Sequence, residues 1–167
     1  CEKGWFAPSM PDLNQANPLV LNYLTQNAIW WIEYADLDGL RVDTYSYNDK
    51  EGIAKWTKAI MDEYPHFNIM GEVWLNQSAQ VSYWQKDSPI SAIQSYNTYL
   101  PTVMDFPLFN AIGEAFRAAP SWDKGMIQLY DNLTNDFLYK DINNLLIFAE
   151  NHDTARLNHV YPKIADY

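Results

Sequence analysis

The hydrophobic pattern of the chain alternates between helical spacing and short apolar runs. Residues 18–36 carry apolar side chains three and four positions apart, with Asn17 as a candidate N-cap and Pro18 at the first helical position. The same pattern predicts helices at residues 49–64, 108–118 and 123–138, and a short helix with a long loop within residues 76–100. Four short apolar runs predict buried strands at residues 39–43, 67–74, 102–106 and 144–151.

Strands that alternate with helices in this way predict an α/β fold of parallel β/α units. A sheet of this kind belongs either to an open doubly wound fold or to part of a (β/α)8 barrel. No glycine-rich phosphate loop follows any of the four strands, which weakens the nucleotide-binding open sheet. Residues 1–167 contain no linker and no repeat, so we expect them to form one domain.

Composition and charge exclude several classes of protein. The 167 residues are 48% apolar and 19% charged, which is a globular composition with enough length for a core. The formal net charge is −10 and no Lys/Arg-rich run occurs, so nucleic-acid binding is not expected. No apolar run approaches the roughly 20 residues that span a bilayer. Aromatic residues make up 16% of the chain, which fits a sugar-binding surface and a packed core equally well.

The single cysteine, Cys1, rules out an internal disulfide. A terminal Cys also fits a mature bacterial lipoprotein, but the residues that follow it read as part of a fold rather than as a polar tether. No signal peptide is visible at the start of the sequence. Compartment therefore stays open.

Three acidic residues stand at the ends of predicted strands. Asp43 ends the first strand, Glu72 the second, and Asp153 follows the fourth. In β/α folds the carboxyl ends of the strands and the loops after them carry the chemistry. Asp43 and Glu72 are 29 residues apart, close to the roughly 31 residues of an average barrel unit. Glu72 and Asp153 are 81 residues apart, which fits two further units with one enlarged loop.

The neighbours of the first two acids predict different protonation. Arg41 and Asp43 are two apart on one strand and face the same way, so the guanidinium favours the ionised form of Asp43 and lowers its pKa. Glu72 lies among apolar residues and Trp74, where partial burial raises its pKa. One ionised and one protonated carboxyl facing the same cleft is the requirement for glycoside hydrolysis.

Other interpretations of the same residues remain open. Arg41 and Asp43 also fit a purely structural ion pair. His152 and Asp153 are also potential ligands of a divalent metal. Trp74 suits a stacking platform for a sugar and ordinary packing equally well.

The segments "GLRVDTY", "GEVW" and "FAENHDT" resemble three signature segments of the α-amylase family of glycoside hydrolases, and "MPDLN" resembles a fourth. They occur in the family's order and spacing, from Met10 to about Arg156. The form of "MPDLN" and the tyrosine-rich "DTYSYNDKE" are most similar to the neopullulanase and cyclomaltodextrinase side of the family. The absence of a Lys-His pair shortly after Asp43 argues against many true α-amylases.

The resemblance implies a role for each matching residue. Asp43 corresponds to the catalytic nucleophile, Glu72 to the general acid/base and Asp153 to the third acid, which stabilises the transition state. Arg41 corresponds to the arginine that supports the nucleophile, and His152 to a histidine that hydrogen-bonds the sugar. The implied reaction is retaining hydrolysis of α-glucans, with no redox or phosphate cofactor. The family also favours a periplasmic or extracellular location.

The resemblance further implies a partial barrel. Only four of eight strands are identifiable, by analogy the fourth to the seventh, and the family's first signature with an Asn-His pair is absent. We therefore expect residues 1–167 to be part of the catalytic barrel of a larger glycosidase. Any calcium site would lie in the missing part, and the isolated fragment would be inactive. Its uncovered strand edges and apolar faces predict self-association.

Two alternative functions use the same residues. One is a transglycosylase or sucrose-type isomerase of the same family, which differs only in the acceptor of the glycosyl group. The other is a non-catalytic carbohydrate-binding relative that keeps the fold. Such relatives typically lose one or more of the acids, and all three are present in this chain.

Overall fold

The computed structural model describes residues 5–119 and 121–161, so Cys1 and the lipoprotein interpretation lie outside the described residues. Four parallel strands form one sheet in the order β1-β2-β3-β4, and the predicted parallel β/α arrangement is confirmed. The strands are short and end near the acids: β1 Gly39–Val42, β2 Asn68–Gly71, β3 Thr102–Met104 and β4 Leu145–Leu146.

The first two long helices each begin after a residue of a type that commonly caps helices. α1 (Pro18–Ala35) starts after Asn17, whose side chain accepts a hydrogen bond from the Leu19 N–H. α2 (Lys50–Glu63) starts after Asp49, whose side chain accepts from the Gly52 N–H. Both predicted helices are thus confirmed to within a residue or two.

The helices after β3 depart from the prediction. α5 (Phe106–Arg117) begins two residues earlier than expected, because Asp105 caps it by accepting from the Leu108 N–H. The predicted helix at 123–138 is wrong in extent: α6 covers only Ile127–Leu133, and a 3₁₀ turn follows at Asp136–Leu138. At the end of α6, a side chain competes with the helix for backbone hydrogen bonds: Asn135 Nδ2 donates to the carbonyls of Asp131 and Asn132.

All four strands are shorter in the structure than predicted, and the difference is largest for β2 and β4. The run at 67–74 pairs only over Asn68–Gly71, because the chain then makes a tight turn in which the Leu75 N–H donates to the Val73 carbonyl at 2.8 Å. The run at 144–151 pairs only over Leu145–Leu146, at the edge of the described sheet, where β3 alone offers partners. Apolar character was a sign of burial in the run at 67–74, where Ile69 and Val73 are fully buried, but not in the run at 144–151, where Ile147 is 63% exposed.

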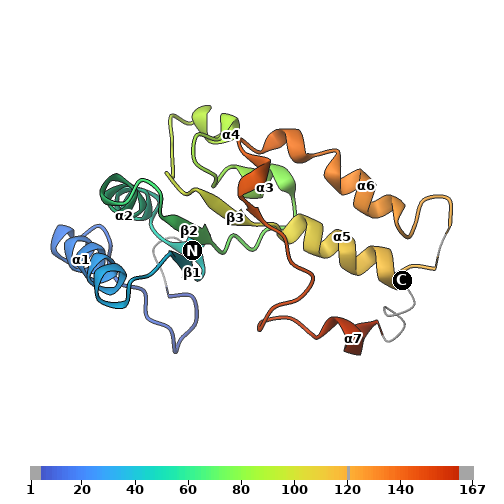
Figure 1. Ribbon diagram of the computed structural model, residues 1–167, viewed down its shortest axis with the longest axis horizontal. Coiled ribbons are helices and arrows are strands. Elements are labelled where there is room, and N and C mark those ends of the chain that lie inside the picture. The colour runs from blue at the N-terminus through green and yellow to red at the C-terminus, as the bar shows by residue number, and fades with distance from the viewer. Residues whose placement is uncertain (1–4, 120, 162–167) are drawn as a thin grey trace.

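The helices lie in two groups about the sheet (Figure 1). α1 and α2 lie side by side near β1 and β2, and α5 and α6 lie together beyond β3. Three short helices occupy the connections: α3 Ser78–Ser82, α4 Pro89–Ala92 and α7 Leu157–Val160. None of the described helices is both long and apolar enough to cross a membrane. The core contains fully buried side chains from strands, helices and loops, among them Tyr45, Ile60, Ile69, Leu100 and Val103.

The pleat of β1 separates apolar from charged side chains. Leu40 and Val42 pack against the core, while Arg41 points to the opposite face. The register pairs Arg41 with Met70 and Val42 with Gly71. Asp43 comes two residues after Arg41, so the two side chains point to the same face of the sheet. The next pair in this register is Asp43 and Glu72, and because side chains in one row of a parallel sheet share a face, Glu72 points to the face of Arg41 as well.

Candidate active site

Glu72 is held by two donors from the neighbouring strand end. Its Oε1 accepts from Arg41 Nη2 at 2.7 Å, and its Oε2 accepts from the Thr44 N–H at 2.8 Å. Only 4% of the residue is exposed. The backbone of Glu72 is also paired, because its N–H donates to Val42 and its carbonyl accepts from the Tyr45 N–H. Both the main chain and the carboxylate are therefore fixed relative to β1.

A single guanidinium connects the three predicted acids. Arg41 Nη1 donates to Asp43 Oδ1 at 2.8 Å, and Nη2 lies 2.7 Å from Glu72 Oε1 and 3.6 Å from Asp153 Oδ2. The sequence predicted the Arg41–Asp43 contact, which is confirmed. It did not predict that Arg41 is shared with Glu72 and Asp153, residues on other strand ends. The three acids thus converge on one charge, as their spacing predicted.

The two acids nearest Arg41 differ strongly in solvent contact. The Asp43 side chain is 59% exposed, whereas that of Glu72 is 5% exposed. Burial raises the pKa of Glu72, and its hydrogen bond from Thr44 and the charge of Arg41 oppose the rise. Asp43 raises the pKa of Glu72 further. The predicted direction of the shift at Glu72, and burial as its cause, are confirmed.

Asp153 and His152 lie on a turn after β4. The Asp153 N–H donates to Asn151 Oδ1 at 3.0 Å, and the Asn151 N–H donates to Thr154 Oγ1 at 2.9 Å. This local bonding presents both residues to solvent, with His152 Nε2 3.1 Å from Asp153 Oδ2 and the His152 side chain 68% exposed. The exposed imidazole is therefore accessible from solvent next to Asp153.

Glu150 belongs to the same segment and has a structural role. Its carboxylate accepts from the Leu157 N–H and from Arg156 Nη1, and the hydrogen bond from Leu157 is the main cause that lowers its pKa. These contacts connect the turn to the start of α7. Glu150 is therefore bound within its own segment rather than directed at the other acids.

Trp74 lies beyond Glu72 with one ring face covered. Its ring stacks on Phe106 with centroids 4.6 Å apart and planes 20° from parallel. The residue is nevertheless 39% exposed. Trp74 thus packs against Phe106 and also keeps part of its surface in solvent, and its role as a stacking platform for a sugar stays a prediction.

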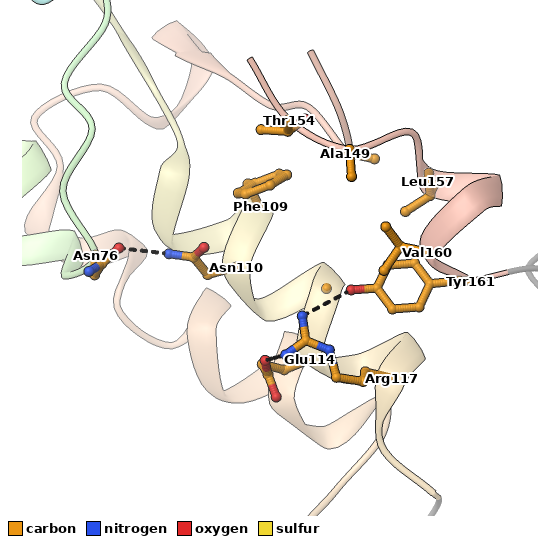
Figure 2. Close-up of a pocket in the computed structure, with 12 residues that line it drawn as sticks. Asn76, Phe109, Asn110, Glu114, Arg117, Ala149, Thr154, Leu157, Val160 and Tyr161 are labelled. Atoms are coloured by element: carbon orange, nitrogen blue, oxygen red, sulfur yellow. Dashed lines mark hydrogen bonds and ion pairs between the residues drawn. The ribbon is translucent and has the colours of Figure 1, made fainter. Parts of the chain in front are cut away.

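A cavity lies away from the three acids. It measures about 430 Å³ and lies between α5 and the segment after β4. Figure 2 shows the ring of Phe109 inside it, with Asn110 hydrogen-bonded to Asn76 at one side and Arg117 bonded to Glu114 at the other. None of Asp43, Glu72 and Asp153 lines this cavity.

A smaller cavity borders the turn after Asp43. It measures about 110 Å³, and its lining includes Met10, Pro11 and Asp12 together with Thr44 and Asn48. The "MPDLN" segment is therefore next in space to the turn that follows Asp43, although about thirty positions separate the two in sequence. Within the described residues, no three His, Cys, Asp or Glu side chains are arranged to hold a metal ion.

The chain is similar in sequence to known proteins. Residues 4–167 match the family described as "Alpha amylase, catalytic domain". The chain belongs to this family. This α-amylase domain is 32% identical over 154 residues to the intracellular maltogenic amylase of Bacillus subtilis (strain 168), an alignment that covers 91% of this chain and 24% of that protein. It is 28% identical over 152 residues to a cyclomaltodextrinase from a Bacillus species, covering 91% of this chain and 25% of that protein.

Solved structures agree with the fold of the α-amylase domain. The crystal structure of α-amylase from Geobacillus thermoleovorans, complexed with acarbose, matches with a TM-score of 0.77 and 30% identity. The match covers 97% of this chain and 33% of that chain. The predicted partial (β/α)8 barrel is thus confirmed, and the domain spans about a quarter of the two curated relatives.

Sequence reasoning missed three polar residues around Glu72. Thr44 supplies a backbone donor, Asn48 bonds the turn that contains Thr44, and Gln15 bonds Asn48 from the segment before α1. Only Asn48 carried a signal, since Asn is common in turns. The partners of all three are set by the fold.

Proposed function

We propose that this chain is part of the catalytic domain of a retaining α-glucan hydrolase acting on α-1,4-linked glucans. The observation that supports this most is the shared face of Asp43 and Glu72, bridged by Arg41 at 2.8 and 2.7 Å, with Asp153 at its edge. The names of the relatives, maltogenic amylase and cyclomaltodextrinase, support α-glucans as the substrate class.

The different surroundings of the two carboxyl groups suit the two roles of this reaction. Asp43 is exposed and bonded to Arg41, so it is the nucleophile that attacks the anomeric carbon. Glu72 is buried with a raised pKa, so it carries the proton that the leaving oxygen receives. Water then attacks the glycosyl-enzyme with Glu72 as base, which restores both groups.

The contact of both acids with one guanidinium favours retention over inversion. Arg41 Nη1 lies 2.8 Å from Asp43 Oδ1, and Arg41 Nη2 lies 2.7 Å from Glu72 Oε1, which brings the two carboxyl groups close together. The carboxyl groups of a retaining pair are about 5–5.5 Å apart, whereas those of an inverting pair are about 6.5–9.5 Å apart, because a water molecule must fit between the second carboxylate and the sugar.

The remaining site residues act on the sugar without taking part in bond breaking. Asp153 and His152, exposed on their turn, hydrogen-bond sugar hydroxyls and stabilise the transition state. Arg41 Nη1 donates to Asp43 Oδ1 and orients the carboxyl group. The exposed part of Trp74 stacks on a sugar ring beside the scissile bond.

The test is the hydrolysis of maltooligosaccharide, cyclodextrin, pullulan and sucrose by a longer protein that contains this domain, with Glu72→Gln as the variant. We expect the variant to lose activity on every substrate, by at least about 10²–10⁴-fold for a lost general acid. Turnover that survives the change would remove Glu72 from its role. Product analysis separates hydrolysis from transfer to another sugar.

The isolated chain of 167 residues is expected to be inactive and to associate with itself. A reducing-sugar assay on the chain alone tests the first point, and activity comparable to the longer protein would contradict it. The expected surfaces for association are the uncovered strand edges of the partial barrel and, in addition, the α1 aromatic face. This face is defined as Trp30, Trp31 and Tyr34, whose rings contact one another and are all exposed. Since Glu33 is the single charged residue in α1, two such faces meet with little repulsion despite a net charge of −10.

A further inference from the structure

The turn after Asp43 adopts a conformation that needs support. Thr44 has φ 48° and ψ 38°, in the left-handed region, where a residue other than glycine is strained by about 1–2 kcal/mol. This conformation directs the Thr44 N–H to Glu72 Oε2 at 2.8 Å. The donor to the predicted general acid therefore depends on a strained backbone, which the surroundings must hold in place.

Asn48 supplies that support from the end of the same turn. Its Nδ2 donates to the carbonyl of Thr44 at 3.2 Å and to the carbonyl of Tyr45 at 3.1 Å. Its Oδ1 accepts from Gln15 Nε2 at 2.5 Å, a contact between residues 33 positions apart. All of the side chain's polar atoms are thus engaged, and the bonds join the segment before α1 to the turn beside Glu72.

A second anchor acts on the next residue of the turn. Tyr45 is fully buried, and its hydroxyl lies 2.8 Å from Thr57 Oγ1 of α2. Its N–H donates to the Glu72 carbonyl at 3.0 Å. The Tyr45 N–H belongs to the same peptide as the Thr44 carbonyl, which accepts from the Tyr47 N–H at 3.0 Å as well as from Asn48. Tyr45, Tyr47 and Asn48 therefore together hold the peptide after Thr44, and Asn48 is the member of this group whose side chain supports the left-handed conformation that sets the direction of the Thr44 N–H.

We infer that Asn48 is a positioning residue for Glu72: through its two bonds to the turn it keeps the Thr44 N–H on the Glu72 carboxylate. The inference rests on the proposed function only in naming Glu72 as the acid. The positioning itself is a property of the turn and is measurable without any substrate.

The charges around Glu72 determine the direction of the effect. Arg41 faces Glu72 from β1 and Asp43 from the strand end, while Asp153 approaches Arg41 from the turn after β4. The side chain of Asn48 hydrogen-bonds to Thr44, Tyr45 and Gln15 and to none of these charged groups, so its loss leaves the charges in place. Removing the Thr44 donor takes a hydrogen bond from the ionised carboxylate, which raises the pKa of Glu72 above its wild-type value.

The experiment is an NMR study of the 167-residue chain and its Asn48→Ala variant. We expect hydrogen-exchange protection of the Thr44 amide to fall about tenfold, which corresponds to one or two lost hydrogen bonds. The carboxyl resonance of Glu72 should titrate at higher pH in the variant. Asn48→Ser, whose hydroxyl can donate to a carbonyl three or four positions earlier, should restore part of both effects.

Asn135→Ala is the matched control. Asn135 Nδ2 donates to the carbonyls of Asp131 and Asn132, four and three positions earlier, in the same pattern as Asn48 and away from the acids. This control should leave the Thr44 amide and the titration of Glu72 unchanged. Equal behaviour of the two alanine variants would overturn the inference.

Two further outcomes are also decisive. If Asn48→Ala does not fold, Gln15→Ala carries the test, because it removes the partner of Asn48 Oδ1 and should loosen the Thr44 amide in the same direction. A Gln15→Ala chain with wild-type protection at Thr44 would then overturn the inference. Failure of the hydrolysis test with Glu72→Gln would instead reject the proposed function and leave the positioning by Asn48 intact.

Discussion

Gly71 connects the packing of the core to the placement of Glu72, and its replacement by alanine tests that connection. A Cβ at Gly71 would lie 2.5 Å from Leu100 Cδ2 and 3.0 Å from Tyr45 Cγ. Carbon atoms attract best at about 3.5–4.0 Å. Leu100 and Tyr45 are both fully buried, and the Tyr45 hydroxyl is bonded to Thr57, so neither side chain has free space into which to move.

The size of the effect follows from this lack of space. Overpacking a closed core by one methyl group costs about 1–3 kcal/mol. Replacing glycine also reduces the conformational entropy of the unfolded chain, which stabilises the folded state by about 0.4–1 kcal/mol. The net expectation for Gly71→Ala is a loss of about 1–2 kcal/mol in the free energy of unfolding, equivalent to roughly 2–8 °C in melting temperature for a domain of this size.

Urea unfolding followed by tryptophan fluorescence measures the free energy, with Gly113→Ala as the control. Gly113 lies within α5, and a Cβ there meets only the Tyr161 hydroxyl, at 3.1 Å. Because alanine is favoured over glycine inside a helix by about 1 kcal/mol, the control should be as stable as the wild type or more so. A Gly71→Ala chain that matches the wild type would refute the argument that Leu100 and Tyr45 close against β2.

Two other measurements test the electrostatics and the surface. Burial raises the pKa of Glu72, so its proton stabilises the folded chain below the ordinary glutamate pKa of about 4.3, and this contribution is lost as pH rises through the higher folded pKa. As pH rises from about 4, the unfolding free energy of Glu72→Gln should therefore increase relative to that of the wild type. A difference between the two unfolding free energies that is constant with pH would contradict this. Trp30→Lys on the α1 aromatic face should shift the chain toward monomer in sedimentation experiments, whereas Trp122→Lys, at a residue that is 98% exposed on another segment, should not. Equal sedimentation of the two variants would remove the α1 aromatic face as the contact.

Much of the fold could be predicted because the physics behind it is local. The apolar spacing of residues 18–36, with Asn17 and Pro18 before it, predicted α1, since caps and helical period act within a few residues. The strand ends predicted where Asp43 and Glu72 would lie, because carboxyl ends of parallel strands share one edge. The lengths of β2 and β4 were not predictable from apolar character, since pairing depends on which neighbour the fold provides.

The sequence by itself determined the order of strands and helices, the acids at the strand ends and the pairing of Arg41 with Asp43 two residues away. Only the tertiary structure decided that Arg41 also binds Glu72, 31 positions away, and that Thr44 turns left-handed to donate to the same carboxylate. The reason is the range of the interactions: periodicity and caps act between neighbours in sequence, whereas the burial of Glu72 and its two donors exist only after β1 and β2 have paired.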